Sequence, residues 1–242
     1  VTINQSYRTT ISSAFSAASF SQPSMAGGTS LFQLDGDLDT DAGAITISNA
    51  TVDLNANVTT TAGGANGLVT IHAGSGSKGA PAVSLASGKS ITTTAAVAGT
   101  TSGAIDINSK GSVNLQGELV TTGVAGDSMA GSGATGGAVT IDTGNSTATI
   151  TVSDITTSGG AAYAASNTKG GDAGSIALTT STSRWVELDN STISAAGGAG
   201  DGSGAQGAGA NITFDAEVDR SEEHTSESSH ANISYAVFCL KK

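Results

Sequence analysis

One short pattern recurs along this 242-residue chain: a glycine followed by two apolar residues that alternate with polar or small ones. The glycines that open it are Gly43, Gly67, Gly103, Gly137 and Gly174, and a shifted copy follows Gly209. Successive glycines are 24, 36, 34, 37 and 35 residues apart, a period typical of stacked repeats. Alternation at period two sends the apolar pair to one face, so each copy predicts a short, half-buried β-strand.

Two further alternations follow each copy in a fixed order. The second occurs at Val52/Leu54, Val83/Leu85, Val113/Leu115, Ile150/Val152 and Val186/Leu188, and the third at Val58, Ile91, Leu119, Ile155 and Ile193. One repeat has too little apolar surface to fold alone, whereas a neighbour about 4.8 Å away supplies backbone hydrogen bonds and a continuous core. The sequence therefore predicts an all-β fold, a right-handed parallel β-solenoid (β-helix) of about six coils with about three short strands per coil.

The composition agrees with a narrow core. Glycine accounts for 34 residues and aromatic residues for 4% of the chain, so large side chains are too few to fill a wide interior. The segments 123–137, 159–174 and 197–209 consist almost entirely of small or polar residues. We interpret them as flexible glycine-rich loops on one edge of the solenoid.

The chain divides into three parts. Residues 1–30 alternate weakly and fit either one irregular first coil or a flexible edge, whereas 31–219 carry the solenoid repeats. Residues 220–242 differ in composition, and their segments Arg220–Glu227 and Ile233–Leu240 resemble, in order, a translated sequencing-library adapter. We interpret 220–242 as a non-native, disordered tail.

Setting that tail aside removes Cys239, His224 and His230, and leaves no cysteine and one histidine, His72. Disulfides, thiol catalysis and cysteine-based zinc sites are then excluded from the repeats. The formal net charge of −11 opposes binding to nucleic acid or anionic membranes, and no apolar run is long enough to span a bilayer. The chain begins at Val1 without a signal peptide, and we interpret it as a fragment whose export signal lies upstream.

The style of the repeats carries a family resemblance. Gly136–Ile141 reads Gly-Gly-Ala-Val-Thr-Ile, Ile155–Gly160 reads Ile-Thr-Thr-Ser-Gly-Gly, and looser copies extend over 31–219. This pattern resembles the repeat regions of bacterial large exoproteins, namely filamentous-haemagglutinin-like adhesins and autotransporter passenger domains. The resemblance implies a structural or adhesive rod at the bacterial cell surface. Its expected partners are outer-membrane secretion machinery and the glycans or proteins of host or neighbouring cells. The alternative is a non-catalytic part of a carbohydrate-active β-helix enzyme.

The densest cluster of charge is Asp35, Asp37, Asp39 and Asp41. On an extended segment, alternate spacing would place these carboxylates on one face, where they suit calcium, a cation that prefers oxygen ligands. The cluster matches neither the EF-hand template nor tandem glycine-rich calcium repeats. A solvated acidic edge that discourages aggregation is the alternative interpretation.

Groups suited to catalysis are sparse, and no enzymatic activity is expected. The outward residues of the second strands would be Asp53, Ser84, Asn114, Thr151 and Glu187, with no two acids adjacent. His72 has no acidic partner at a fixed sequence spacing, so we interpret it as a solvated residue after a strand.

Two surface features leave alternatives open. Outward Thr-x-Thr pairs at Thr59/Thr61 and Thr92/Thr94 continue, with decay, as Val120/Thr122, Thr156/Ser158 and Ser194/Ala196. Some ice-binding solenoids use such an array, but threonine also favours strands because it is β-branched. Trp185 beside Arg184 either stacks on carbohydrate or covers a coil edge.

Overall fold

The computed structural model describes residues 1–4, 7–22, 29–41, 43–61, 67–74, 81–95, 97–144, 147–181, 184–215, 217–219 and 238–239. No α-helix occurs among these residues, and hence none that could cross a membrane. The described strands form three sheets, in which strands that are neighbours in space come from successive repeats.

Sheet A contains seven parallel strands that stack in chain order. They are β3 (Phe20–Gln22), β6 (Ile45–Asn49), β9 (Val69–Ala73), β12 (Ile105–Ser109), β15 (Val139–Thr143), β18 (Ile176–Thr180) and β21 (Ile212–Asp215). Their register is that of the sequence pattern, because Ile71, Ile107 and Ile141 are direct neighbours on adjacent strands.

Sheets B and C contain eight strands each. Sheet B consists of β1 (Arg8–Ile11), β4 (Leu31–Leu34), β7 (Thr51–Leu54), β10 (Val83–Leu85), β13 (Val113–Leu115), β16 (Ile150–Val152), β19 (Trp185–Leu188) and β22 (Glu217–Asp219). Sheet C consists of β2 (Phe15–Ala17), β5 (Leu38–Thr40), β8 (Val58–Thr60), β11 (Ser90–Thr92), β14 (Glu118–Val120), β17 (Ile155–Thr156), β20 (Thr192–Ser194) and β23 (Phe238–Cys239). All pairings are parallel except that of β23 with β20.

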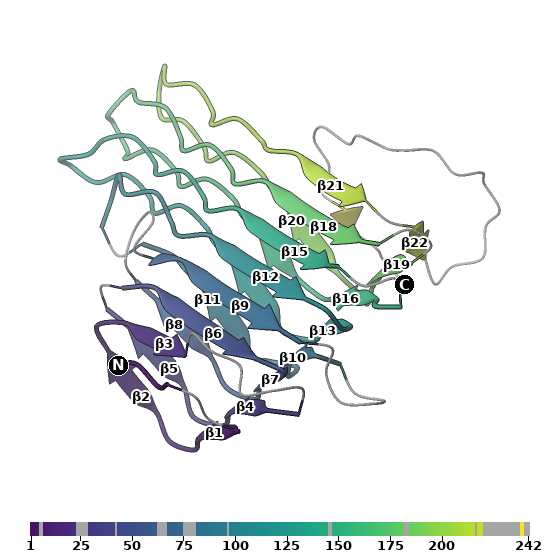
Figure 1. Ribbon diagram of the computed structural model, residues 1–242. Helices are drawn as coiled ribbons and strands as arrows, with labels where there is room; N and C mark the ends of the chain where they lie inside the picture. The colour runs from purple at the N-terminus through teal and green to yellow at the C-terminus, as the bar shows by residue number, and fades with distance from the viewer. Residues whose placement is uncertain are drawn as a thin grey trace.

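Three consecutive strands make one coil, so that coil 1 is β1–β3 and coil 7 is β19–β21 (Figure 1). The predicted right-handed parallel β-solenoid with three strands per coil is confirmed. The described part holds seven complete coils, one more than expected, because Arg8–Gln22 forms a coil of its own. Of the predicted tail at 220–242, the structure describes only the two residues of β23, and the remainder lies outside the described residues.

A single hydrophobic core, which we call the spine, runs through all the coils. Ile47, Ile71, Ile107 and Ile141 lie in one inward column of sheet A, and Ile45 begins the adjacent inward column, which continues through Val69, Ile105 and Val139. None of these side chains has more than 1% of its surface exposed. Aliphatic columns of sheets B and C close the same core. Near the N-terminal end of the spine, aromatic side chains fill the core, and the ring centres of Phe20 and Phe32 are 5.9 Å apart.

Buried threonines link sheet C to the glycines of the repeat marker. Thr93, Thr121 and Thr157 are fully buried, and their hydroxyls donate to the carbonyl oxygens of Gly103, Gly137 and Gly174. These glycines stack so closely that a Cβ on any of them would overlap backbone atoms of the coil below. The marker glycine is therefore a packing requirement of the stack.

The glycine-rich loops leave one edge of the solenoid, as predicted, and project together from coils 5–7 (Figure 1). We call 121–137, 157–174 and 195–210 the glycine lobe. In each loop an outgoing and a returning leg run side by side, since Gly137 N donates to Thr121 O and Gly174 N to Thr157 O, both at 2.8 Å. Legs of successive coils are also bonded, for example Gly123 N to Ser158 O at 2.8 Å and Gly159 N to Ala196 O at 2.9 Å.

The expectation that these loops are flexible is corrected by their hydrogen bonding. A ladder crosses the lobe from Gly160 N to Ala134 O, Gly171 N to Gly160 O, Gly198 N to Gly171 O and Gly207 N to Gly198 O, at 2.8–2.9 Å. Backbone N–H groups that donate hydrogen bonds to the next coil recur every third residue, as at Gly123 and Gly126. Three residues are also the period of the polyproline II helix. The lobe is therefore held by main-chain contacts between extended legs.

Candidate functional site

The predicted acidic cluster is spread around a corner of coil 2. Asp35 follows β4, where its carboxylate accepts from Gln33 Nε2 at 2.8 Å and from Asn55 Nδ2 at 3.0 Å. These hydrogen bonds, led by that of Asn55, lower the pKa of Asp35. Asp37 directly precedes β5, and its Oδ1 accepts a hydrogen bond from the backbone N of Asn57 at 2.9 Å. Both carboxylates thus join coil 2 to coil 3.

The other two aspartates of the acidic cluster, Asp39 and Asp41, lie beyond this corner of coil 2. Asp39 sits on the outward side of β5, and Asp41 is exposed just after that strand. The described residues contain no group of three or more His, Cys, Asp or Glu side chains that could hold a metal ion. The calcium site at Asp35, Asp37, Asp39 and Asp41 stays a prediction, and the carboxylates of Asp35 and Asp37 have structural hydrogen bonds in its place.

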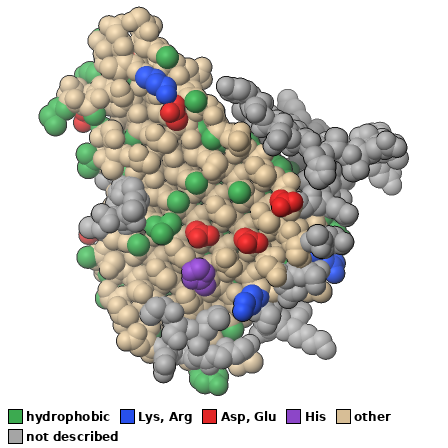
Figure 2. Space-filling view, turned by 45° about the horizontal axis from the view of Figure 1, so that its top comes forward, with side chains coloured by type: hydrophobic (Ala, Val, Ile, Leu, Met, Phe, Trp, Pro, Cys, Tyr) green, Lys and Arg blue, Asp and Glu red, His purple; other side chains and the backbone are tan. Residues whose placement is uncertain are grey.

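The outer face of sheet A gathers titratable side chains that sequence spacing did not connect. One outward column contains His72, Asn108 and Asp142 on three successive strands. Asp106 lies in the neighbouring column, on the strand between those of His72 and Asp142, so it is a diagonal neighbour of both. Figure 2 shows His72 in purple on an open face, with acidic side chains beside it. This face offers hydrogen bonds to a polar ligand without enclosing it.

A groove of about 670 Å³ lies at the corner between sheets B and C. The groove spans the corners of coils 4–7, of which those of coils 5 and 6 are two residues long, Gln116–Gly117 and Ser153–Asp154, and those of coils 4 and 7 are longer. Its charged lining residues are Lys89, Glu118, Asp154 and Asp189. No apolar side chain lines the groove, so it lacks the walls that small-molecule sites normally have.

The outward column of sheet B has the predicted order, from Asp53 through Ser84, Asn114 and Thr151 to Glu187. Each acid is bonded to its neighbour, since Ser84 Oγ donates to Asp53 Oδ1 at 2.6 Å and Thr151 Oγ1 donates to Glu187 Oε2 at 3.2 Å. Three coils separate Asp53 from Glu187, so these two acids cannot act together on one bond. The column continues on β22, where Asp219 is the register neighbour of Glu187.

Trp185 is 38% exposed on β19, and the Arg184 guanidinium carbon lies 5.9 Å from the centre of its ring. This cation–π contact uses one side of the indole. The indole is open enough to stack on a ligand and also lies at the last complete coil, so both interpretations of Trp185 stay predictions.

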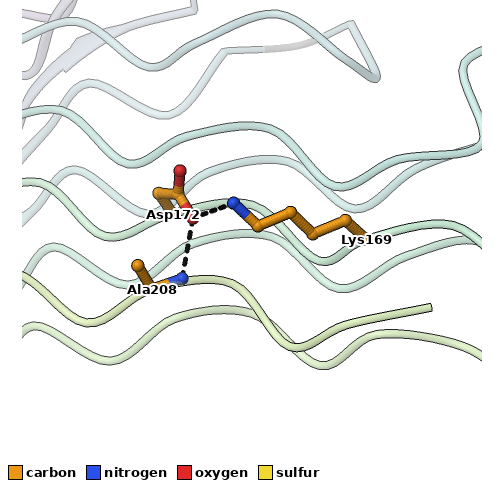
Figure 3. Close-up of polar contacts among 3 residues, drawn as sticks. All are labelled: Lys169, Asp172 and Ala208. Atoms are coloured by element: carbon orange, nitrogen blue, oxygen red, sulfur yellow. Dashed lines mark hydrogen bonds and ion pairs between the residues drawn. The ribbon is translucent and has the colours of Figure 1, made fainter.

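Asp172 joins two layers of the glycine lobe by a hydrogen bond and also forms an ion pair within its own layer (Figure 3). Lys169 Nζ lies 2.6 Å from Asp172 Oδ1, and the same oxygen accepts from the backbone N of Ala208, one coil further on, at 2.7 Å. The hydrogen bond from Lys169, followed by that from Ala208, lowers the pKa of Asp172. The arrangement is structural, since it supplies an acceptor to the next coil.

In comparisons with protein-family models, curated proteins and solved structures, no significant match to this chain was found.

Proposed function

We propose that this chain is a non-catalytic structural and adhesive rod segment of a secreted or surface-displayed bacterial exoprotein. The observation that supports the proposal is the unbroken parallel stacking of coils 1–7 on all three sheets. At about 4.8 Å per coil, such a stack adds length at a constant rate, with roughly 30 Å for seven coils. Each coil depends on its neighbours for its core and its hydrogen bonds, as expected of a load-bearing rod.

The outer faces support the adhesive part of the proposal. Sheet A presents the titratable side chains of His72, Asp106 and Asp142 together with the amide of Asn108, and the groove presents further carboxylates. These groups are open to solvent and repeat at the spacing of the coils. Weak polar contacts of this kind become adhesive when many copies act together on a cell surface.

Attachment of protein-coated particles tests this function. Fluorescent beads that carry the full chain are incubated with cultured epithelial cells and with bacterial cells, beside beads that carry albumin. We expect more attachment with the chain than with albumin, and a reduction when His72, Asn108 and Asp142 are all replaced by serine. The matched control replaces Asn114 and Thr151 on sheet B by serine. Attachment equal to that of albumin on both cell types would contradict the adhesive role.

The diagonal arrangement of Asp106 with His72 and Asp142 favours one second candidate, a non-catalytic part of a carbohydrate-active enzyme. That function requires binding of a soluble polysaccharide. Gel-shift electrophoresis through a panel of polysaccharides separates the two candidates, because retardation by one polymer, without attachment of beads to cells, would favour the enzyme.

A further inference from the structure

The outer face of sheet C differs from the other two faces over coils 3–6. We call eight outward positions the threonine face: Thr59, Thr61, Thr92, Thr94, Val120, Thr122, Thr156 and Ser158. All eight are partly exposed and uncharged, and seven of them carry a hydroxyl. The faces of sheets A and B, in contrast, carry His72 and several carboxylates.

The threonine face is a regular array in two directions. Along the stack, Thr92 is the direct neighbour of Thr59 and of Val120, and Val120 is that of Thr156. The register continues into the second column, where Thr121 N donates to Thr156 O at 2.9 Å and Gly123 N donates to Ser158 O at 2.8 Å. Equivalent side chains are therefore about 4.8 Å apart along the stack and roughly 6.7 Å apart along each strand.

The array is held rigidly from behind. Between the two columns lie Thr60, Thr93, Thr121 and Thr157, all fully buried. The hydroxyls of the last three are bonded to the carbonyl oxygens of the marker glycines. A surface that is fixed in this way loses little conformational entropy when it meets a solid partner.

Charged groups border the array without entering it. Asp39 and Asp41 precede it in coil 2, and Glu118 lies at the corner beside the groove. Charged groups hold tightly bound water of their own, whereas hydroxyls and methyl groups on a fixed repeat can place water molecules at regular intervals. Each such contact is weak, but contacts made simultaneously to one ordered surface add up.

From this geometry we propose that the threonine face binds ice, with the hydroxyl and methyl groups of coils 3–6 as the contact surface. The ligand is the ordered water of a crystal surface, which needs no enclosed pocket. This inference does not depend on attachment to cells.

Thermal hysteresis and inhibition of ice recrystallisation, measured on the full 242-residue chain, test the proposal. We expect a measurable gap between melting and freezing, and loss of most of that gap in Thr92→Lys and in Thr156→Lys. Thr140→Lys on sheet A introduces the same side chain on an outward strand position and should retain the gap. Val120→Thr completes the first column and should widen it. Circular-dichroism melting confirms that each variant is folded.

Three results would overturn the proposal. The first is a folded wild-type chain with neither hysteresis nor inhibition of recrystallisation. The second is an equal loss in Thr140→Lys and Thr92→Lys. The third is a dimer in sedimentation that Thr92→Lys dissociates, since the threonine face would then be an interface between two copies of the chain.

Discussion

The spine and the glycine lobe stack the same coils by opposite means. In the spine, aliphatic side chains such as Ile107 fill the space between three sheets, and their burial provides the favourable free energy. In the lobe the legs approach so closely that Gly160, Gly171 and Gly198 leave no space for a side chain, and the ladder of backbone hydrogen bonds joins them.

This difference shows that one repeat can encode two kinds of packing. The spine tolerates substitution among apolar residues of similar size, because its specificity lies in the alternation of apolar and polar positions. In the lobe we expect substitution of glycine to be tolerated only where an added Cβ would meet open space. Collagen follows the same logic, since only glycine fits at its crowded axis.

The largest effect is expected in the spine. Ile107→Ala leaves a cavity among fully buried neighbours of coils 3 and 5, so we expect a loss of about 3 kcal/mol in the free energy of unfolding. Urea denaturation followed by circular dichroism measures this loss. The control, Thr140→Ala on the outer face of sheet A, should change the free energy by less than about 0.5 kcal/mol. Similar losses in both variants would contradict a spine at this column.

Adding a methyl group in the glycine lobe should lower the free energy of unfolding somewhat less than Ile107→Ala does. In Gly171→Ala the new Cβ would overlap the Ala134 carbonyl, and we expect a loss of about 2 kcal/mol, because the legs must separate. Gly144→Ala is the matched control, since no atom lies within 4 Å of its added Cβ, and it should be neutral or slightly stabilising. Thermal melting of both variants gives the comparison. An unchanged melting temperature in Gly171→Ala would mean that the legs are not closely packed.

The buried threonines that join the two regions should have a smaller effect. Thr121→Val removes the hydroxyl bonded to Gly137 at nearly constant volume, for an expected loss of about 1 kcal/mol. Thr60 is equally buried, but its hydroxyl has no partner among the described residues, so Thr60→Val should be neutral or stabilising. Chemical denaturation of the two variants measures the difference, and equal losses would argue against the role of the hydroxyl bond to glycine.

The smallest effect concerns pH. The pKa of Asp172 is lowered in the folded chain, so its contribution to stability is present above the ordinary carboxyl pKa and is lost as the pH falls through the lowered value. The difference in melting temperature between wild type and Asp172→Asn should therefore shrink on acidification. A difference that stays constant from neutral to acidic pH would show that the charge of Asp172 does not stabilise the lobe.

The sequence predicted the spine because a period of two is visible in each strand and recurs at a nearly constant interval. The inward column from Ile47 to Ile141 and the outward column from Asp53 to Glu187 both have the predicted register. The acidic cluster was less predictable, because the corner between β4 and β5 turns Asp35 away from Asp39.

Two features of the structure, the close packing of the glycine lobe and the surroundings of His72, could not be predicted from the sequence for physical reasons. Glycine, alanine and serine dominate both flexible linkers and closely packed legs, so composition alone does not distinguish them, although glycine spacings of three, as at Gly123 and Gly126, are a usable signal. The neighbourhood of His72 was missed because the repeat marker spans only the first outward residue of each strand of sheet A, for example Thr70 on β9. The second column, two residues further along, places Asn108 and Asp142 in line with His72.

Amide hydrogen exchange followed by NMR shows whether the glycine lobe is a hydrogen-bonded part of the stack. We expect slow exchange at Gly160, Gly171 and Gly198, whose N–H groups form the ladder, with protection comparable to that of Ile107 in the spine. Exchange of these three amides at the rate of an unfolded chain, while Ile107 stays protected, would contradict it and return the lobe to a set of flexible loops.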